Sequence, residues 1–285
     1  MFAHPLAVIV ALCLNGTAAW AGSVQPTEIS QTDRKAMMTA VCGTMPERDE
    51  KGIWSCRSCP DYTSFSGEVT DSPTFHLRKV YPGSFTAHKP QVLATMYGCE
   101  PHSNNFGGTA LLERTGQVWH QLDFFPSALP SECLEFKAQD GLTTLACYQS
   151  AEYNGGVESA WVDFIRSTGT TLGVEDLFAG LGDRINALNS EWRDFLCWDW
   201  ALDIKKDAAQ PERALLVDIR GARRSPNSEE NGWVMCGKNV IAASTVKGHF
   251  ILRYLFDGLS MTLDPNSKGE MSALKAFLST PGKRD

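Results

Sequence analysis

The feature that most constrains this fold is a succession of short apolar runs, rich in β-branched and aromatic residues and separated by Gly, Pro, Asn or Asp. Such spacing is typical of antiparallel strands joined by tight turns. The chain is therefore predicted to be mainly β, with a degenerate propeller-like meander preferred and a β-sandwich as the alternative. The runs expected as strands are residues 77–81, 92–97, 109–113, 118–125, 133–138, 142–147, 160–165, 196–204, 213–220, 233–236, 240–244, 249–256 and 259–263.

Helical patterns are few and short. Residues 32–42 are expected to form a helix capped at Ser30 or Thr32 and ended by the glycine that follows. Residues 174–188 place four large aliphatic side chains on one helical face, which predicts a second helix despite two internal glycines. A further helical turn is expected within residues 271–278.

The N-terminal residues 1–21 have the pattern of a secretory signal peptide, with an apolar run followed by the small-residue site Ala19-Trp20-Ala21. Cleavage is expected before Gly22, which predicts a periplasmic or extracellular protein. No later apolar run approaches the roughly 18 residues of a membrane-spanning helix, so no membrane span is expected. The remaining chain is expected to consist of a Cys-rich strap, residues 22–72, and a mainly β domain, residues 73–285.

Removal of the signal would leave an even number of cysteines in an oxidising compartment, which favours disulfides. The Cys56-Arg57-Ser58-Cys59 motif also matches redox pairs and half of a zinc site. However, no helical pattern follows Cys59 and no second pair has matching spacing, so structural bridges are preferred. The eight cysteines are Cys42, Cys56, Cys59, Cys99, Cys133, Cys147, Cys197 and Cys236.

One disulfide can be predicted from hairpin geometry. A three-residue loop, Gln139-Asp140-Gly141, with Gly141 in the left-handed region closes the pair Ala138/Leu142. Counting outward from this pair places Cys133 opposite Cys147 at a non-hydrogen-bonded position, where Cα atoms lie about 4.5 Å apart and a bridge can form.

Charge and motifs exclude several functional classes. The net charge is −7, and no Lys/Arg cluster is longer than two residues, which argues against binding to nucleic acid or to anionic membranes. The sequence contains neither a Gly-x-Ser-x-Gly elbow nor a His-Glu-x-x-His motif. No cofactor and no metal are predicted.

Two groups of residues are candidates for ligand binding. The loop between the runs at 92–97 and 109–113 carries polar side chains, and binding residues often lie on loops held by strands, although turn formation explains them equally well. A tryptophan group could stack on a sugar, but Trp198 and Trp200 fall on the apolar side of their strand and favour a core role. The candidate ligand-binding residues are Glu100, His102, Asn104, Asn105 and Trp192.

Residues 83–112 resemble one repeat of the FG-GAP family, the blades of integrin-type β-propellers. The similarity rests on Gly83-Ser84-Phe85-Thr86, on the apolar run 92–95 and on Phe106-Gly107-Gly108 with the run that follows. The resemblance implies a propeller. The calcium loop of the family is missing here, because residues 86–91 contain no carboxylate, so calcium binding is not implied.

These observations favour an exported, disulfide-stabilised β protein that binds an unidentified protein or glycan. The alternative is a periplasmic hydrolase, similar to a glycosidase, that uses clustered carboxylates. The candidates for that chemistry are Asp194, Asp199 and Asp203, and a glycosidase would need two carboxyl groups about 5 to 9.5 Å apart in a cleft.

Overall fold

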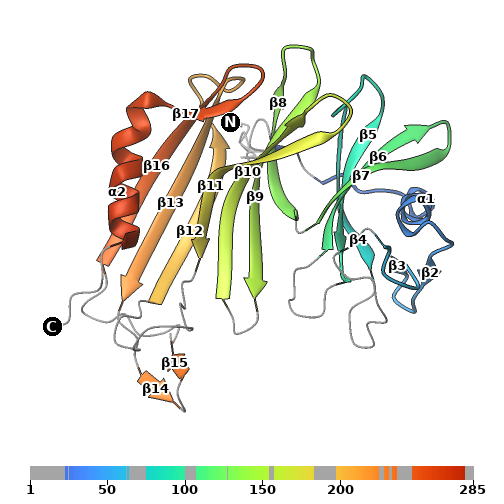
Figure 1. Cartoon of the computed structure of the whole chain (residues 1–285), viewed down its shortest axis with the longest axis horizontal. Helices are drawn as coiled ribbons and strands as arrows, with labels where there is room; N and C mark the ends of the chain where they lie inside the picture. The colour runs from blue at the N-terminus through green and yellow to red at the C-terminus, as the bar shows by residue number, and fades with distance from the viewer. Residues whose placement is uncertain are drawn as a thin grey trace, which may run out of the picture.

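The computed structural model describes residues 23–24, 26–61, 63, 75–99, 107–126, 128–153, 157–182, 197–224, 228–230, 233–235 and 246–279. Its strands form three large antiparallel sheets that follow one another across the molecule (Figure 1). The mainly β class is therefore confirmed. Two helices, α1 (Gln31–Cys42) and α2 (Lys268–Ser279), lie at opposite sides of these sheets.

The N-terminal sheet has the strand order β2-β3-β4-β5-β6-β7, and each strand pairs with its neighbour in the sequence. Strand β5 is buried on both faces over nearly its whole length, as its uninterrupted apolar run indicates. The strands are β2 (Glu47–Arg48), β3 (Trp54–Ser55), β4 (His76–Gly83), β5 (Gln91–Tyr97), β6 (Gly107–Thr115) and β7 (Val118–Pro126).

The central sheet has the order β1-β8-β9-β10-β11, and the C-terminal sheet has the order β12-β13-β16-β17. A separate pair joins β14 to β15, and the 3₁₀ helix η2 (Pro265–Ser267) precedes α2. The strands are β1 (Ser23–Val24), β8 (Pro130–Lys137), β9 (Thr143–Tyr153), β10 (Val157–Ser167), β11 (Leu172–Gly182), β12 (Cys197–Lys206), β13 (Ala214–Arg224), β14 (Ser228–Glu230), β15 (Trp233–Met235), β16 (Val246–Phe256) and β17 (Met261–Leu263).

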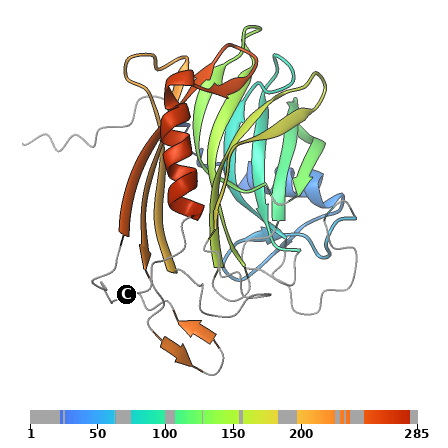
Figure 2. The ribbon, with the colours of Figure 1, turned by 60° about the vertical axis from the view of Figure 1, so that its left-hand side comes forward.

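The central sheet is the middle layer (Figures 1 and 2), and each of its faces contributes residues to a core. Leu134 and Phe164 point from one face into a core shared with the C-terminal sheet and α2. Leu145 and Ile165 point from the opposite face into a core shared with the N-terminal sheet. Successive residues of a strand face opposite sides, so a strand with apolar residues in consecutive positions serves both cores.

Helix α1 covers the outer face of the N-terminal sheet. Its Met37, Met38 and Val41 are buried in a third core with residues of β4, β5 and β6. The helix begins as expected, because the Ser30 side chain accepts a hydrogen bond from the Asp33 amide, and it ends at Gly43 with a left-handed φ of 66°. The Cys-rich segment thus contributes both a helix and two short strands to the N-terminal sheet.

One predicted helix is wrong. Residues 172–182 form strand β11, which pairs with β10 from Ser167↔Leu172 to Ser159↔Gly182, whereas residues 183–188 lie outside the described part of the chain. Two irregularities interrupt this pairing near Leu177 and Phe178, so the alternation of side chains between the two faces of the sheet is broken there. The resulting spacing of apolar residues resembles that of one face of a helix, although the glycines at 180 and 182 disfavour a helix.

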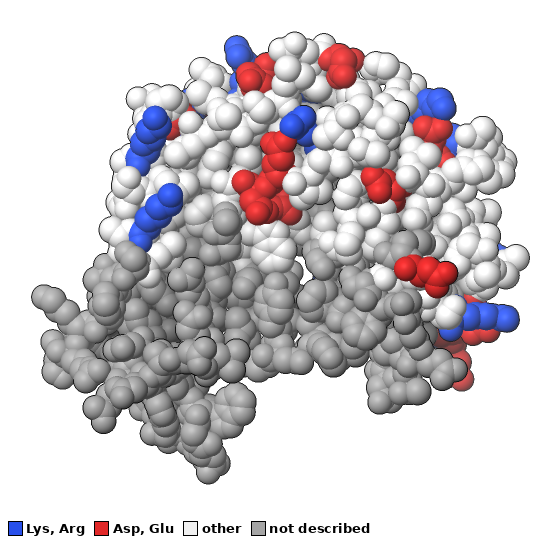
Figure 3. Space-filling view, in the orientation of Figure 1, with Lys and Arg blue, Asp and Glu red and all other residues white. Residues whose placement is uncertain are grey.

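The described helices include none that is both long and apolar enough to cross a membrane. In Figure 3, Lys and Arg are interspersed with Asp and Glu over the described part of the face, and uncharged residues cover most of that part. The described part of this face therefore shows no extended basic surface of the kind that binds nucleic acid.

Candidate functional site

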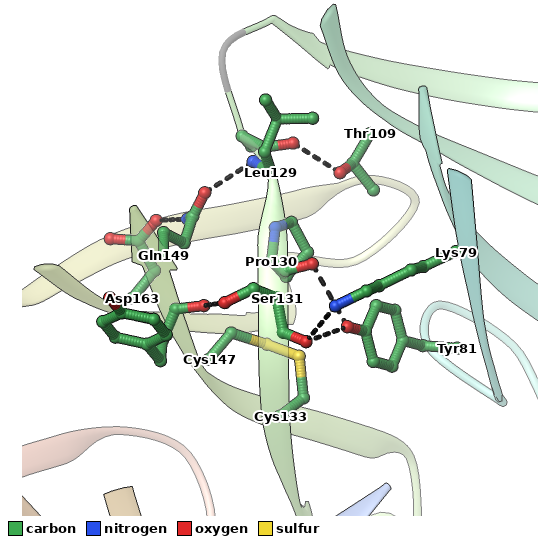
Figure 4. Close-up of a disulfide and its surroundings, with 12 residues drawn as sticks. Lys79, Tyr81, Thr109, Leu129, Pro130, Ser131, Cys133, Cys147, Gln149 and Asp163 are labelled. Carbon is green, nitrogen blue, oxygen red and sulfur yellow. Dashed lines mark hydrogen bonds between the residues drawn. A yellow bond between two sulfur atoms is a disulfide. The ribbon is translucent and has the colours of Figure 1, made fainter. Parts of the chain in front are cut away.

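A chain of buried polar contacts joins the N-terminal sheet to the central sheet beside the Cys133–Cys147 disulfide (Figure 4). We call it the polar seam and define it as Lys79, Tyr81, Thr109, residues 128–131, Gln149 and Asp163. Residues 128–131 include the end of the connection from β7 to β8, which passes from one sheet to the other. The polar seam therefore lies where the chain passes from the N-terminal sheet to the central sheet.

On one side of the seam, two side chains of β4 donate hydrogen bonds to backbone carbonyls of β8. The Tyr81 hydroxyl contacts the carbonyl oxygens of Pro130 and Ser131 at 3.1 and 2.9 Å, and Lys79 Nζ lies 2.7 Å from the Ser131 oxygen. Burial, as the largest cause, raises the pKa of Tyr81 and lowers that of Lys79. These contacts fix the relative position of the two sheets.

On the other side of the seam, Gln149 connects the backbone to a buried carboxylate. The Leu129 amide donates to Gln149 Oε1 at 2.5 Å, and Gln149 Nε2 donates to Asp163 Oδ2 (Figure 4). The indole Nε1 of Trp161 donates to the same oxygen at 3.2 Å. One oxygen of Asp163 therefore has two donors. Its other oxygen, Oδ1, is buried and accepts no hydrogen bond from a nitrogen or hydroxyl donor among the described residues.

Asp163 also faces a second carboxyl group. It is 3% exposed and lies directly opposite Asp176 of β11, so the two side chains share one face of the sheet. Burial is the largest cause that raises the pKa of Asp163 to about 7, and the hydrogen bond and charge of Asp176 add to it. Asp163 therefore keeps its proton at a pH at which an ordinary aspartate has lost it.

The pairing irregularity in β11 lies next to this carboxyl pair. Val162 pairs with Phe178 and Asp163 pairs with Asp176, which leaves Leu177 without a partner in β10. The carbonyl oxygen of Leu177 accepts a hydrogen bond of 2.8 Å from the Tyr254 hydroxyl of the C-terminal sheet. The bulge lies just beyond the carboxyl pair, because the pairing from Ser167↔Leu172 to Asp163↔Asp176 keeps one regular register.

Asp163 differs from the other buried aspartates among the described residues. Asp218 lies 3.0 to 3.5 Å from Lys205, Arg220 and His249, and Asp264 lies 2.5 Å from Arg253. No described Lys or Arg side chain forms an ion pair with Asp163, whose partners are an amide, an indole and a second acid. Burial of an acid without a counterion lowers the stability of the folded protein. Such groups occur most often at functional sites.

The residues predicted from the sequence as ligand-binding lie outside the described part of the chain. These are Glu100, His102, Asn104, Asn105 and Trp192, together with Asp194 of the alternative carboxylate cluster. The backbone of Asp199 lies in β12. Asp203, in the same strand, is half-buried and lies opposite Asp218. The two candidate binding groups thus stay predictions.

The predicted Cys133–Cys147 disulfide is confirmed, with Cα atoms 4.1 Å apart and the two residues paired across the hairpin. The turn has the expected form, because the Ala138 amide donates to the Leu142 oxygen and Gly141 has a φ of 83°. Cys56 and Cys59 belong to two separate structural bridges, Cys42–Cys56 and Cys59–Cys99. The interpretation of that motif as structural is therefore confirmed.

The sequence analysis missed the carboxyl pair for two reasons. Asp163 was placed correctly in a strand, and the signal available was one acid inside the apolar run Trp161-Val162-Asp163-Phe164-Ile165. Its partner Asp176 was assigned to a helix, which removed any cross-strand neighbour. Correct assignment of β11 as a strand would have made the contact predictable.

Comparison of the chain with protein-family models, curated proteins and solved structures finds no match in any of the three.

Proposed function

We propose that this disulfide-stabilised β protein is a binding module that is exported, and that it binds its ligand at the Asp163–Asp176 pair. The observation that carries the proposal is the buried Asp163 Oδ1, which has no nitrogen or hydroxyl donor among the described residues. Beside it lie a second carboxyl group, that of Asp176, and no described counterion. A ligand that supplies a donor would satisfy this oxygen. The rigid surroundings support binding, because a preorganised site loses little entropy when it is occupied.

The surroundings of the pair hold it in place through three elements. Gln149 ties Asp163 to the β7–β8 connection, the Cys133–Cys147 bridge joins β8 to β9, and Tyr254 holds the bulge at Leu177. Asp176 is exposed, so the pair is open to solvent on that side. The site therefore combines a fixed, buried acceptor with an exposed acceptor that a ligand can reach first.

Hydrolysis by the same pair is the second candidate function, because two acids that share a proton can act as acid and base. The geometry of a glycosidase does not match, since carboxyl groups in hydrogen-bond contact lie closer than the 5 to 9.5 Å that those reactions require. Both oxygens of Asp163 are also enclosed. Binding is therefore the preferred function. Hydrolysis would be favoured instead if the wild type hydrolysed chromogenic esters, glycosides or peptides and Asp163→Asn did not.

The proposed function can be tested by thermal unfolding of the oxidised protein with a panel of neutral oligosaccharides, amino acids, short peptides and amines. A ligand at ten times its Kd adds about 1.4 kcal/mol, which corresponds to a rise in Tm of roughly 2 to 4 °C for a chain of this size. We expect at least one compound to raise the Tm of the wild type but not that of Asp163→Asn. The control is Asp203→Asn, in which the response should persist.

The proposal fails in either of two outcomes. One is that no compound of the panel changes the Tm of the wild type. The other is that every compound that does so acts equally on Asp163→Asn, which would place binding elsewhere on the protein.

A further inference from the structure

The carboxyl pair offers acceptors and lacks donors. Asp163 Oδ1 has no nitrogen or hydroxyl donor among the described residues, and the donors Gln149 and Trp161 are both used by Asp163 Oδ2. Asp176, whose carboxyl group is in hydrogen-bond contact with Asp163, adds two further acceptor oxygens once the pair has lost its proton. The group that completes such a site carries several N–H or O–H donors. Because both acids carry negative charge once the shared proton leaves, a donor with positive charge fits best.

We propose that the Asp163–Asp176 pair binds a primary ammonium group, which bridges Asp163 Oδ1 and the carboxylate of Asp176. This inference rests on the proposed binding function and names its ligand class. An ammonium group has three donors and one compact charge. Two of the donors are used by the two acids, and the third is left for solvent.

Two other cations fit the site less well. A guanidinium binds one carboxylate through both of its oxygens, and Asp163 Oδ2 is already occupied by Gln149 and Trp161. Calcium requires six to eight oxygen ligands, and no group of three or more His, Cys, Asp or Glu that could hold a metal occurs among the described residues. Gln149 Oε1 cannot add a ligand, because it accepts from the Leu129 amide.

The ammonium group approaches from the side of Asp176. That residue is exposed in β11, whereas Asp163 is 3% exposed, so a ligand meets Asp176 before it reaches the buried oxygen. Rotation of the exposed Asp176 side chain opens Asp163 Oδ1 without any change in the backbone. The same chemistry is offered by a free alkylamine and by the side chain of a lysine in a peptide.

Ammonium and proton compete for the same position. Burial and Asp176 raise the pKa of Asp163 to about 7, so at lower pH the proton must leave before the ammonium binds. A primary alkylamine stays charged throughout this range, because its pKa is close to the roughly 10.4 of Lys. Affinity should therefore fall about tenfold for each pH unit below 7 and level off above it.

The experiment is calorimetric titration of the oxidised protein with n-butylamine hydrochloride at pH 8 and pH 6. Three matched probes separate charge from hydrogen bonding: n-butanol has no charge, tetramethylammonium has no N–H donor, and calcium chloride tests for a metal. A short peptide with one lysine, and the same peptide acetylated on that lysine, separates the two sources of the ammonium group. The variants are Asp163→Asn and Asp176→Asn, with Glu212→Gln, which changes an exposed carboxylate on the β12–β13 connection, as the control.

We expect n-butylamine to bind at pH 8, at least fivefold more weakly at pH 6, and at least tenfold more weakly to Asp163→Asn and Asp176→Asn. The Glu212→Gln variant should match the wild type within about twofold, the precision expected for an independent position. A tighter interaction with the lysine peptide than with n-butylamine would identify a protein partner as the source. Near-ultraviolet circular dichroism of each variant establishes that it is folded.

The inference is overturned if n-butanol, tetramethylammonium or calcium binds as tightly as n-butylamine, or if both carboxyl variants keep the wild-type affinity. The proposed function is tested separately. A neutral compound that requires Asp163 would support binding at the pair and refute the ammonium class, whereas the absence of any Asp163-dependent ligand would refute both.

Discussion

Buried acids are held in this protein in two different ways. Asp264 and Asp218 are surrounded by basic side chains that stabilise their charge. Asp163 instead contacts Gln149, Trp161 and Asp176. Its burial and the neighbouring Asp176 favour the protonated acid and outweigh the hydrogen bond from Trp161, which favours the charged form. A single side chain therefore makes the stability of the fold depend on pH near neutrality.

The first prediction concerns that dependence. The pKa of Asp163 is about 7 in the folded chain and near its ordinary value of 3.8 when unfolded, so the unfolded chain loses its proton first. The free energy of unfolding of the wild type should fall between about pH 4 and pH 7, relative to that of Asp163→Asn, and stay constant above pH 7. The total change should be on the order of 1 to 4 kcal/mol.

Urea unfolding of the wild type and of Asp163→Asn at pH 4, 5.5, 7 and 8 measures this difference. The Asp203→Asn variant controls for the loss of one surface charge. A difference that rises with pH, or that shows no trend, would contradict the raised pKa.

Another prediction at the residue scale concerns Gln91, which is 1% exposed. Its side chain accepts hydrogen bonds from the amides of Phe85 and Thr86 and donates to Thr86 Oγ1 and Glu113 Oε2. Gln91→Met leaves two buried amides without an acceptor, so stability should fall by about 2 to 4 kcal/mol.

The matched change is Gln117→Met in the exposed turn between β6 and β7, which should alter stability by less than about 0.5 kcal/mol. Chemical unfolding of the two variants gives both values. Equal effects would show that the hydrogen bonds of Gln91 do not hold the β4–β5 turn. The resemblance of residues 83–112 to one FG-GAP repeat stays a prediction.

At the scale of elements, hairpins with a clear turn were predicted well. The turns at Gly116, Gly141 and Gly258 all have positive φ, and each joins the strands expected on either side. Local chemistry decides such turns, so the sequence near them is sufficient. Strand β11 was missed because its pairing with β10, the preceding strand, is irregular, and because its bulge contacts Tyr254, which is distant in the sequence.

Two disulfides allow a controlled test at this scale. Cys133–Cys147 and Cys42–Cys56 both have a sequence separation of 14, so loop closure alone predicts the same contribution of about 3 kcal/mol for each. A β-hairpin with a favourable turn is partly ordered when unfolded, whereas the other bridge joins the end of a helix to a loop. We expect Cys133→Ala/Cys147→Ala to lose less stability than Cys42→Ala/Cys56→Ala.

Urea unfolding of the two double variants, with a non-reduced peptide map to establish the remaining bridges, provides the comparison. A larger loss for the hairpin bridge would show that its buried position between two sheets outweighs the ordering of the unfolded chain. In either case the hairpin register should persist, because the strand pairs on both sides of the bridge do not need it.

At the scale of the whole molecule, the mainly β class could be predicted, but the arrangement of the sheets could not. Which face of the central sheet meets which partner depends on the polar seam and on Tyr254, and neither has a local signal. The bridge Cys59–Cys99, with a sequence separation of 40, likewise depends on the tertiary structure. The pattern within a strand shows that a residue is buried. Only the complete fold shows which residues it packs against.

The predicted signal cleavage is also tested at this scale. A start at Gly22 would keep strand β1, whose Ser23 and Val24 pair with Leu134 and Cys133. We expect intact-mass analysis of protein recovered from the periplasm or medium to show a chain that begins at Gly22. Recovery of a chain that retains Met1 in the cytoplasm, or of one that begins after Val24, would contradict the prediction.

The pairing of β1 with β8 has a consequence for the order of folding. Almost every other strand pair in the three large sheets joins neighbours in the chain, so each hairpin can form as soon as its second strand leaves the ribosome or a translocation channel. Strand β1 emerges before all of them, yet its partner β8 follows only after the whole N-terminal sheet. Strand β1 therefore remains unpaired until β8 has been made. Its pairing with the edge of β8 then indicates that assembly of the central sheet has begun.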